Sequence, residues 1–421
     1  MVIASIDIQD GAVVQLRQGK ELVLTRDNPP ALAEAFDRYG EVAVIDLNAA
    51  KNTGNNRELL VPLLRKARCR VGGGVKTPEQ ARELVSMGAC KIIVGSKAFR
   101  TGGAWGVNTD FLAAMGRAVG KERLIAAVDA RDRGIVVDGW KTATGLDLVE
   151  SARAVEPFVS EILFTCVERE GTMTGIDREA VRALRTALSC GLTVAGGVST
   201  HEEIEALGGI GCNVQIGMAL YTGAVSLAEG FVRSLNWSKD GSSLLPVIAQ
   251  SPDRQVVMTG FTDRTALRET FRRGSLCFHS RTRDALWMKG ETSGNTLKLI
   301  RIRADCDRDA LLATVEPAGP VCHTGGYSCF DVERRYTPEF LQSLIAERFR
   351  DAPEGSYTAT LDDALVRRKV MEEAYEVCSA KSRREIVWEA SDLLFFLTAL
   401  ITRAGIPFQE VLDELDRRHK K

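Results

Sequence analysis

Val2-Ile3-Ala4-Ser5-Ile6-Asp7 is a short apolar run that ends in a carboxylate, and Leu124-Ile125-Ala126-Ala127-Val128-Asp129 repeats this pattern 122 residues later. Two glycine turns keep the same spacing, because Gly74 in Val-Gly-Gly-Gly-Val and Gly197 in Ala-Gly-Gly-Val lie 123 residues apart. Gly95 and Gly217 lie 122 residues apart. One nearly constant offset across three landmarks indicates two homologous halves, which suit a substrate with two similar ends.

Short β-branched apolar runs alternate with helical stretches up to about residue 237. This alternation predicts a parallel sheet covered by helices, and eight such strands predict a (β/α)8 barrel, the TIM-barrel fold. We therefore expect residues 1–237 to form this barrel. The eight runs are residues 2–6, 42–45, 70–71, 91–94, 124–128, 161–164, 192–195 and 214–216.

The rest of the chain divides into two further parts, which makes the protein multidomain. Residues 238–243, Ser-Lys-Asp-Gly-Ser-Ser, are polar and predict a linker. Residues 244–332 predict a compact, β-rich α+β domain, with apolar runs at 244–249, 256–261, 276–278 and 297–302. The pattern then turns helical, with long helices expected at 364–380 and 384–404, so residues 336–421 predict an all-α domain.

The composition argues against several classes of protein. The 421 residues are 45% hydrophobic and 26% charged and carry a net charge of −1, whereas a general nucleic-acid binder usually has a basic excess. No apolar run reaches membrane-spanning length, and we expect no targeting segment before the first strand. The 10 cysteines follow no disulfide framework, so a cytoplasmic protein with buried or metal-bound thiols fits best.

Two carboxylates of the barrel lie where an active site is expected, because the active sites of such barrels form at the carboxyl ends of strands. Asp7 and Asp129 end the first and fifth expected strands and could act as acid and base. Glycine turns at strand ends let a phosphate approach the backbone closely. A single glycine pair is more often an ordinary tight turn, but the repeat favours two phosphate cradles and a bisphosphorylated substrate. The cradle residues are Gly73, Gly74, Gly95, Ser96, Gly196, Gly197 and Gly217.

These motifs, together with Gly139-Trp140, Thr165 and Gly171-Thr172, make residues 1–235 resemble the histidine-pathway isomerase family. That family converts a phosphoribosyl-formimino-AICAR ribonucleotide to its phosphoribulosyl isomer by an Amadori rearrangement. The resemblance implies that Asp129 protonates the ribose ring oxygen, that Asp7 removes the C2′ proton, and that Thr165 assists by hydrogen bonding.

Three thiols and three carboxylates crowd one segment of the middle domain. Soft sulfur suits zinc, whereas hard oxygen suits magnesium. Three thiolates leave one tetrahedral position open, and zinc there lowers the pKa of water towards ~7. If the segment is extended, the alternating aspartates share one face. A lone cysteine is more often inert core, but this cluster is not a lone cysteine. Its members are Cys306, Cys322 and Cys329 for zinc, and Asp305, Asp307 and Asp309 for magnesium.

Residues 280–295 add a polar loop beside a tryptophan, which is typical of nucleotide binding. With Asp-Cys-Asp-x-Asp, Cys-His and Ser-Cys-Phe, residues 244–330 closely resemble phosphoribosyl-AMP cyclohydrolase, which opens the adenine ring at the N1–C6 bond with zinc-activated water. The resemblance implies zinc on the cysteines, magnesium on the aspartates, and a homodimer, because the family's zinc ligands come from two subunits. His323 is a candidate proton shuttle, with a structural histidine as the alternative. The expected substrate contacts are Arg281, Trp287, Lys289, Glu291, Ser293 and Asn295.

Five carboxylates lie on the two long helices expected in the C-terminal domain. Spacings of three and four residues bring them to one side of each helix. Facing acids repel one another unless cations lie between them, so magnesium holding a pyrophosphate is expected. A solvated acidic face is the usual alternative, but neighbours such as Ala390 and Leu394 suggest that the acids border a core. The residues are Glu372, Glu373, Glu376, Glu389 and Asp392, with Lys369 before them.

The C-terminal pattern resembles phosphoribosyl-ATP pyrophosphohydrolase over residues 336–421, an all-helical family in which magnesium-activated water cleaves the α–β phosphoanhydride. The three resemblances describe consecutive steps, placed along the chain in the reverse of reaction order. We therefore expect a trifunctional histidine-biosynthesis enzyme that binds Zn²⁺, Mg²⁺ and small phosphoribosyl nucleotides, and neither nucleic acid nor membrane. The alternatives are a bifunctional cyclohydrolase–pyrophosphohydrolase with a non-catalytic barrel, and a zinc-stabilised nucleic-acid module fused to an NTP pyrophosphohydrolase.

Overall fold

The computed structural model describes residues 1–101, 103–237, 241 and 243–419. Ser238, Lys239, Asp240 and Ser242 of the predicted linker lie outside the described residues. The chain divides into two compact units. The first contains residues 1–249 and 259–318, and the second contains residues 250–258 and 319–421.

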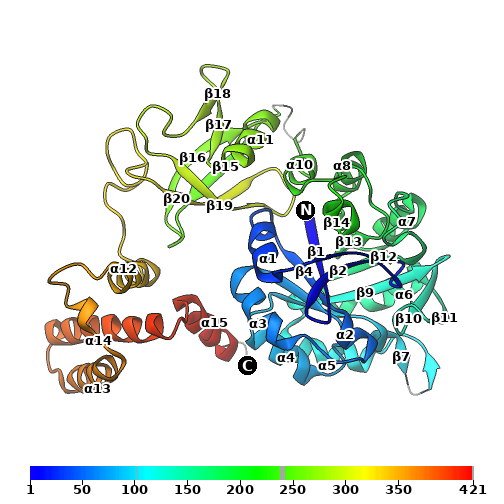
Figure 1. Ribbon diagram of the computed structural model, residues 1–421, viewed down its shortest axis with the longest axis horizontal. Coiled ribbons are helices and arrows are strands. Elements are labelled where there is room, and N and C mark those ends of the chain that lie inside the picture. Colours follow the sequence, from blue (N-terminus) through cyan, green and yellow to red (C-terminus); the bar gives the residue numbers. More distant parts are fainter. Residues whose placement is uncertain (102, 238–240, 242, 420–421) are drawn as a thin grey trace. The chain divides into compact units, whose positions relative to one another are not determined.

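A closed ring of eight parallel strands forms the centre of the N-terminal part (Figure 1). Each strand pairs in parallel with the next, and the last pairs with the first. The strands coincide with the eight predicted runs, so the predicted (β/α)8 barrel is confirmed. In ring order they are β1 (Val2–Gln9), β4 (Val42–Asp46), β5 (Cys69–Gly72), β6 (Lys91–Val94), β9 (Leu124–Arg131), β12 (Glu161–Cys166), β13 (Gly191–Ala195) and β14 (Asn213–Ile216).

Helices surround this ring and bury their apolar faces against it. The larger ones are α1 (Pro29–Asp37), α3 (Arg57–Lys66), α4 (Pro78–Ser86), α5 (Thr109–Val119), α6 (Leu148–Val155), α7 (Arg178–Ala187), α8 (His201–Gly209) and α10 (Leu227–Arg233). The short helices α2 (Leu47–Lys51) and α9 (Met218–Tyr221) and the small hairpin of β7 (Arg100–Thr101) and β8 (Ala104–Trp105) lie in the connections.

The repeat extends beyond the ring. Strands β1 and β9 each continue into an antiparallel hairpin, which the sequence patterns did not predict. The hairpin strands are β2 (Ala12–Arg17) and β3 (Glu21–Arg26) in the first half, and β10 (Gly134–Val137) and β11 (Thr142–Asp147) in the second. Helices α4 and α8 both begin with a threonine capping box, at Thr77 and Thr200. The two halves are therefore built alike.

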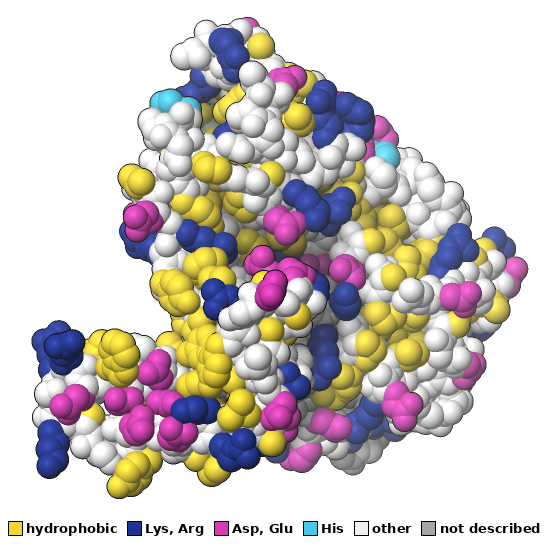
Figure 2. All heavy atoms as spheres, turned by 60° about the vertical axis from the view of Figure 1, so that its left-hand side comes forward, with side chains coloured by type: hydrophobic (Ala, Val, Ile, Leu, Met, Phe, Trp, Pro, Cys, Tyr) yellow, Lys and Arg dark blue, Asp and Glu magenta, His cyan; other side chains and the backbone are white. Residues whose placement is uncertain are grey.

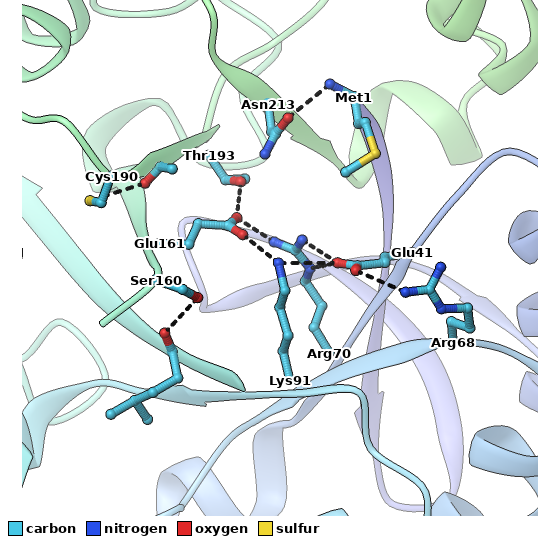
Figure 3. Close-up of polar contacts among 12 residues, drawn as sticks. Met1, Glu41, Arg68, Arg70, Lys91, Ser160, Glu161, Cys190, Thr193 and Asn213 are labelled. Atoms are coloured by element: carbon cyan, nitrogen blue, oxygen red, sulfur yellow. Dashed lines mark hydrogen bonds and ion pairs between the residues drawn. The ribbon is translucent and has the colours of Figure 1, made fainter. Parts of the chain in front are cut away.

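A buried ion network closes the amino-terminal end of the barrel (Figure 3). The fully buried guanidinium of Arg70 lies 2.5 Å from Glu161 and also pairs with Glu41. Lys91 lies 3.0 Å from Glu161, and the Thr193 hydroxyl donates to the same carboxylate. Burial alone would raise the pKa of Glu161, but the charges of Arg70 and Lys91 outweigh it and lower the pKa to about 2.

The middle region combines strands with one helix, as predicted. Four strands form a sheet in the order β16-β15-β20-β19, and two more form a hairpin, β17–β18. The strands are β15 (Leu245–Gln250), β16 (Val256–Thr262), β17 (Cys277–Ser280), β18 (Ala285–Met288), β19 (Leu297–Ala304) and β20 (Leu311–Pro317), and the helix is α11 (Arg264–Arg273). Strands β18 and β20 were not among the predicted runs.

The C-terminal part is helical, as predicted, and the two long helices lie within one residue of their expected bounds. The helices are α12 (Pro338–Asp351), α13 (Asp363–Ser379), α14 (Arg383–Arg403) and α15 (Phe408–His419). A small core centred on Leu341, Ile345, Val366, Phe396 and Ala399 joins the first three of them. The expectation that Ala390 and Leu394 pack in a core beside the acids is wrong, because both are exposed.

Large hydrophobic side chains of α13 and α14 also face outward. They include Met371, Tyr375, Val387 and Trp388, each at least 60% exposed. Figure 2 shows one face of the molecule, on which hydrophobic side chains form patches between charged ones. Among the helices described, none combines the length and apolar character that crossing a membrane requires.

The barrel should depend on Arg70. Replacing it with methionine leaves Glu41 and Glu161 buried without their main counter-charge, which should lower the free energy of unfolding by about 3–5 kcal/mol. The exposed Arg57, 2.5 Å from Glu83, is a matched control, and Arg57→Met should cost less than about 1 kcal/mol. Urea denaturation measures both. Ionised Glu161 adds to the free energy of unfolding above its ordinary pKa of 4.5, and this stabilisation is lost as the pH falls towards about 2. The loss of stability caused by Arg70→Met should therefore become smaller over that range. Equal losses in the two variants would refute this role.

Candidate active sites

The predicted barrel residues all line one cavity of about 480 Å³. They come from the carboxyl ends of the strands and the turns that follow, as the fold requires. Ile93, Leu163 and Ala195 project into the barrel from three strands and form part of the apolar wall. The lining contains Asp7, Asp129, Thr165, Gly73, Gly74, Gly95, Ser96, Gly196, Gly197 and Gly217.

Asp7 and Asp129 occupy equivalent positions in the two halves but have different partners. The Ser5 hydroxyl donates to Asp7 Oδ1 at 2.8 Å, and Trp140 Nε1–H donates to Asp129 Oδ2 at 2.8 Å. Burial raises the pKa of Asp7 to about 6 against the opposing hydrogen bond from Ser5. Burial also raises the pKa of Asp129, against hydrogen bonds from Trp140 and Thr165. Asp7 can therefore exchange protons close to neutral pH.

Glu170 is a third carboxyl in this cavity that the sequence analysis missed. Burial raises its pKa to about 8, and the nearby charges of Asp7 and Asp129 add to the rise. Its loop is fixed to the first half of the barrel, because the Gln18 N–H donates to the Glu170 carbonyl at 2.9 Å. The neighbouring Gly171-Thr172, which carried part of the resemblance, was the available signal.

The glycine turns approach neighbouring backbone too closely for any side chain. A Cβ at Gly73 would overlap the Asp46 carbonyl oxygen at the end of β4, and a Cβ at the equivalent Gly196 would lie 2.6 Å from the Cys166 carbonyl oxygen at the end of β12. Both glycines have positive φ, at 97° and 88°. The equivalent turns in the two halves are thus held in the same way, and they border one cavity.

Other polar groups that line the cavity were not predicted from the sequence. Four cations line it, on the side chains Lys51, Lys76, Lys97 and Arg100. The buried Oε1 of Gln215 also lies in its lining and accepts no hydrogen bond from the described residues. An unpaired buried acceptor is costly unless a ligand supplies a donor. The cavity therefore offers acids, cations and an open acceptor together.

The three aspartates of the middle region converge through a turn. Their carboxylate oxygens lie within 4.8 Å of one another. Strand β19 ends at Ala304, so the extended conformation considered for this segment is wrong. Instead, Asp305 Oδ1 accepts from the N–H groups of Asp309 at 3.1 Å and Ala310 at 3.2 Å. Oxygen ligands at this spacing suit a hard divalent cation.

Two of the three zinc-type cysteines meet in the second unit. The Thr324 hydroxyl donates to Cys322 Sγ at 3.0 Å. Hydrogen bonds from Thr324 and Cys329 lower the pKa of Cys322, which favours the thiolate that zinc needs. His323 is exposed, with Nδ1 3.9 Å from Cys322 Sγ. Cys306 belongs to the first unit. The ten cysteines are all thiols, not disulfides.

The expected nucleotide contacts lie on the β17–β18 hairpin and the loop that follows it. Trp287 pairs with Phe278 across the hairpin, with ring centroids 5.6 Å apart. The Arg281 guanidinium lies 3.8 Å from the centre of the Phe261 ring. His279 bridges Asp263 and Asp284, at 2.9 and 3.1 Å. Along the following loop lie Lys289, Glu291, Ser293 and Asn295.

The C-terminal acids only partly converge. Carboxylate oxygens of Glu373, Glu376 and Glu389 lie within 4.8 Å of one another. Desolvation, Glu376 and Asp392 raise the pKa of Glu373 against the opposing charge of Lys369. Desolvation and the same acids raise the pKa of Glu389. A cation at this cluster would relieve the repulsion.

Two of the predicted C-terminal acids lie beside this cluster. Glu372 is exposed and pairs with Lys369 at 2.9 Å, and it is not one of the three acids that converge. Asp392 faces an open surface depression shared with Arg383, Arg384 and Trp388. The structure therefore divides the predicted five acids into a group of three and two flanking residues.

Comparisons with known sequence families follow the same three-part division. Residues 1–226 match the family described as "Histidine biosynthesis protein". Residues 258–331 match phosphoribosyl-AMP cyclohydrolase, and residues 339–419 match phosphoribosyl-ATP pyrophosphohydrolase.

Three relatives match less than half of this chain but nearly all of their own length. The "Histidine biosynthesis bifunctional protein HisIE" of Bacillus subtilis is 42% identical over 204 residues, which is 44% of this chain and 96% of that protein. The protein of the same name from Pyrococcus furiosus is 38% identical over 207 residues, 46% of this chain and 99% of its own length. The protein of the same name from Xanthomonas campestris is 41% identical over 194 residues, which is 44% of this chain and 94% of that protein.

Glu170 should make barrel stability fall as the pH rises. Its pKa is about 8 in the folded barrel and ordinarily 4.5, so between these values the folded state keeps a proton that the unfolded state has lost. Glu170→Gln mimics the protonated acid and removes this cost. We expect the variant to gain more stability over the wild type at pH 8 than at pH 5, measured by urea denaturation. An equal difference at both pH values would show that Glu170 titrates normally.

Proposed function

Since the chain belongs to the histidine biosynthesis protein family, we propose that it carries out three consecutive reactions of that pathway. The C-terminal domain hydrolyses phosphoribosyl-ATP to phosphoribosyl-AMP and pyrophosphate. The middle domain opens the adenine ring, and the barrel isomerises the product by an Amadori rearrangement. The observation that carries the isomerase step is a single cavity that holds three titrating carboxyls between two equivalent sets of glycine turns.

The charge states of the barrel acids support a different role for each of them in the isomerisation. Asp7, with a pKa of about 6, is mostly ionised at pH 7 and suits the base that removes the C2′ proton. Asp129 suits the acid that protonates the ribose ring oxygen, with Thr165 and Trp140 fixing its orientation. Glu170, with a pKa of about 8, stays protonated and keeps the negative charge of the cavity low.

The cavity also suits a substrate with a phosphate at each end. Glycine turns at Gly73-Gly74 and Gly196-Gly197 belong to opposite halves and offer backbone N–H groups. The cations of Lys51, Lys76, Lys97 and Arg100 would balance phosphate charge. The open acceptor Gln215 Oε1 would take a substrate hydroxyl or amine.

For the middle domain, the donor set fits zinc and magnesium. Cys322 is held in a setting that favours the thiolate, and Cys329 lies beside it, so two soft ligands are prepared. Zinc there would supply hydroxide near neutral pH. The converging carboxylates of Asp305, Asp307 and Asp309 fit a hard cation. The β17–β18 hairpin, with Arg281 and Trp287, offers a stacking and charged surface for the nucleotide.

The C-terminal domain needs a cation for a similar reason. Glu373, Glu376 and Glu389 lie close together, and desolvation and the neighbouring acids raise the pKa of Glu373 and of Glu389. Magnesium between the three carboxylates would hold a pyrophosphate. Lys369, one turn away, would contact a phosphate oxygen. The thiol state of all ten cysteines supports a reducing compartment, and we propose the cytoplasm.

Isomerisation should require both strand-end aspartates. Asp7→Asn and Asp129→Asn should each lower the isomerisation rate by about 10²–10⁴-fold, the usual contribution of an acid or base. Supplying phosphoribosyl-ATP with magnesium and zinc, and separating the two isomers chromatographically, measures all three steps in one preparation. The first two steps should continue unchanged in both variants and serve as the internal control. If the wild type isomerises no faster than the variants, the bifunctional alternative with a non-catalytic barrel is correct.

If the zinc ligands come from two protomers, mixing two inactive cysteine variants should restore activity. Cys306→Ser and Cys322→Ser should each abolish ring opening and bound zinc. If Cys306 of one protomer serves the site of its partner, a mixed dimer of the two variants has one intact site. Refolding the variants together should then restore part of the activity and about half of the zinc per mixed dimer. Ligands supplied by one chain would leave the mixture inactive, which would remove the argument for a homodimer.

A further inference from the structure

Arg308 lies between two of the proposed magnesium ligands, Asp307 and Asp309, yet its side chain points the other way. It is only 8% exposed, which is unusual for an arginine in a charged loop. Its backbone has a φ of +66°, a left-handed conformation that few residues other than glycine adopt. Both features need a compensating interaction.

That interaction is with the barrel. Arg308 Nη2–H donates to the Cys212 carbonyl oxygen at 3.0 Å and to Asn213 Oδ1 at 3.1 Å, and Nη1–H donates to the Gly208 carbonyl oxygen at 3.2 Å. The Asn236 N–H donates in return to the Arg308 carbonyl oxygen at 2.9 Å. Four bonds therefore fix one residue of the loop by both its side chain and its backbone.

The anchoring point belongs to the end of the barrel away from the cavity. Gly208 is in helix α8, and Asn213 begins strand β14, whereas the cavity residue Gly217 follows the carboxyl end of the same strand. Asn213 Oδ1 also accepts from the Met1 amino group at 2.8 Å (Figure 3). No residue of the proposed isomerase site is part of this anchor.

The anchor explains how the carboxylates converge. With Arg308 turned into the barrel, the chain reverses, so that Asp305 Oδ1 receives the N–H groups of Asp309 and Ala310. The Asp305 N–H donates to the Ala310 carbonyl oxygen at 3.0 Å and closes the turn. Asp307 and Asp309, one on each side of Arg308, are thereby directed towards Asp305.

We propose that Arg308 is a positioning residue through which the barrel shapes the cation-binding loop of the cyclohydrolase domain. This inference rests on the proposed function of the three aspartates. Its consequence is that magnesium affinity in the middle domain depends on a contact with a different domain, independent of barrel catalysis. Partners that orient metal ligands typically contribute about 10–100-fold to metal affinity.

The test uses the full-length chain with Arg308→Gly, because glycine keeps the left-handed backbone and removes the three side-chain bonds to the barrel. We expect the magnesium concentration for half-maximal ring opening to rise about tenfold, with the rate at saturating magnesium nearly unchanged. Amide hydrogen exchange at Asp309 and Ala310 should become faster. Asn213→Ala, which removes one barrel acceptor, should shift both quantities in the same direction and covers the case in which Arg308→Gly folds poorly.

Arg268→Ala is the matched control. Arg268 in α11 is paired with Glu229 of α10 at 2.7 Å, so it joins the same two domains without contacting the loop. It should change neither the magnesium dependence nor the exchange at Asp309. If Arg308→Gly and Asn213→Ala leave both quantities at wild-type values, the proposal is wrong.

Asp307→Asn separates this outcome from failure of the proposed cation site. If that variant leaves the magnesium dependence unchanged, the three aspartates are not the cation site. Exchange at Asp309 and Ala310 in Arg308→Gly would still report whether the barrel holds the loop. Faster exchange with an unchanged Asp307→Asn would thus keep the anchor and reject the site, whereas unchanged exchange would reject the anchor itself.

Discussion

Crowded carboxylates set the chemistry of every candidate site in this chain. In the barrel, Asp7, Asp129 and Glu170 share an enclosed cavity, and burial raises the pKa of each. Protons therefore limit the charge there, which is what an acid–base isomerisation requires. The groups at Asp305–Asp309 and at Glu373–Glu389 each bring three carboxylates within 4.8 Å of one another and suit cations instead. Crowded negative charge is thus relieved in two ways, by protons in the barrel cavity and by cations at the other two groups.

Buried carboxylates at the amino-terminal end of the barrel show the contrast within one domain. Glu161 is also buried, like the three acids of the cavity, but Arg70 and Lys91 keep its pKa low. It remains ionised and serves stability, while the unpaired acids at the opposite end can exchange protons. This division agrees with the general rule that barrel chemistry lies at the carboxyl ends of strands. Pairing with a cation, more than burial, distinguishes a structural acid from a reactive one here.

The ring strands and the repeat could be predicted from the sequence because their apolar runs are almost fully buried. The long helices could be predicted because their apolar residues recur at helical spacing, although several of those residues are exposed. The sequence analysis missed β3 and β11, whose residues are mostly exposed and carry no apolar alternation against a core. Strand β20 was also missed, although its alternation of buried and exposed residues is a pattern from which a strand can be predicted. Glu170 and the Arg308 turn escaped for another reason. Their roles arise from contacts between segments far apart in the chain, at Gln18 and at Asn213, which no local pattern encodes.

A fused chain gives its barrel two separate uses. The carboxyl end holds the cavity, whereas the amino-terminal end supplies Gly208, Cys212 and Asn213 as acceptors for Arg308. These acceptors are two carbonyls and an amide, so the contact is directional and its strength does not depend on an opposing charge. A barrel that lost its own activity would still be needed to hold the neighbouring loop. Selection for fold at one end and for catalysis at the other can therefore act on the same domain independently.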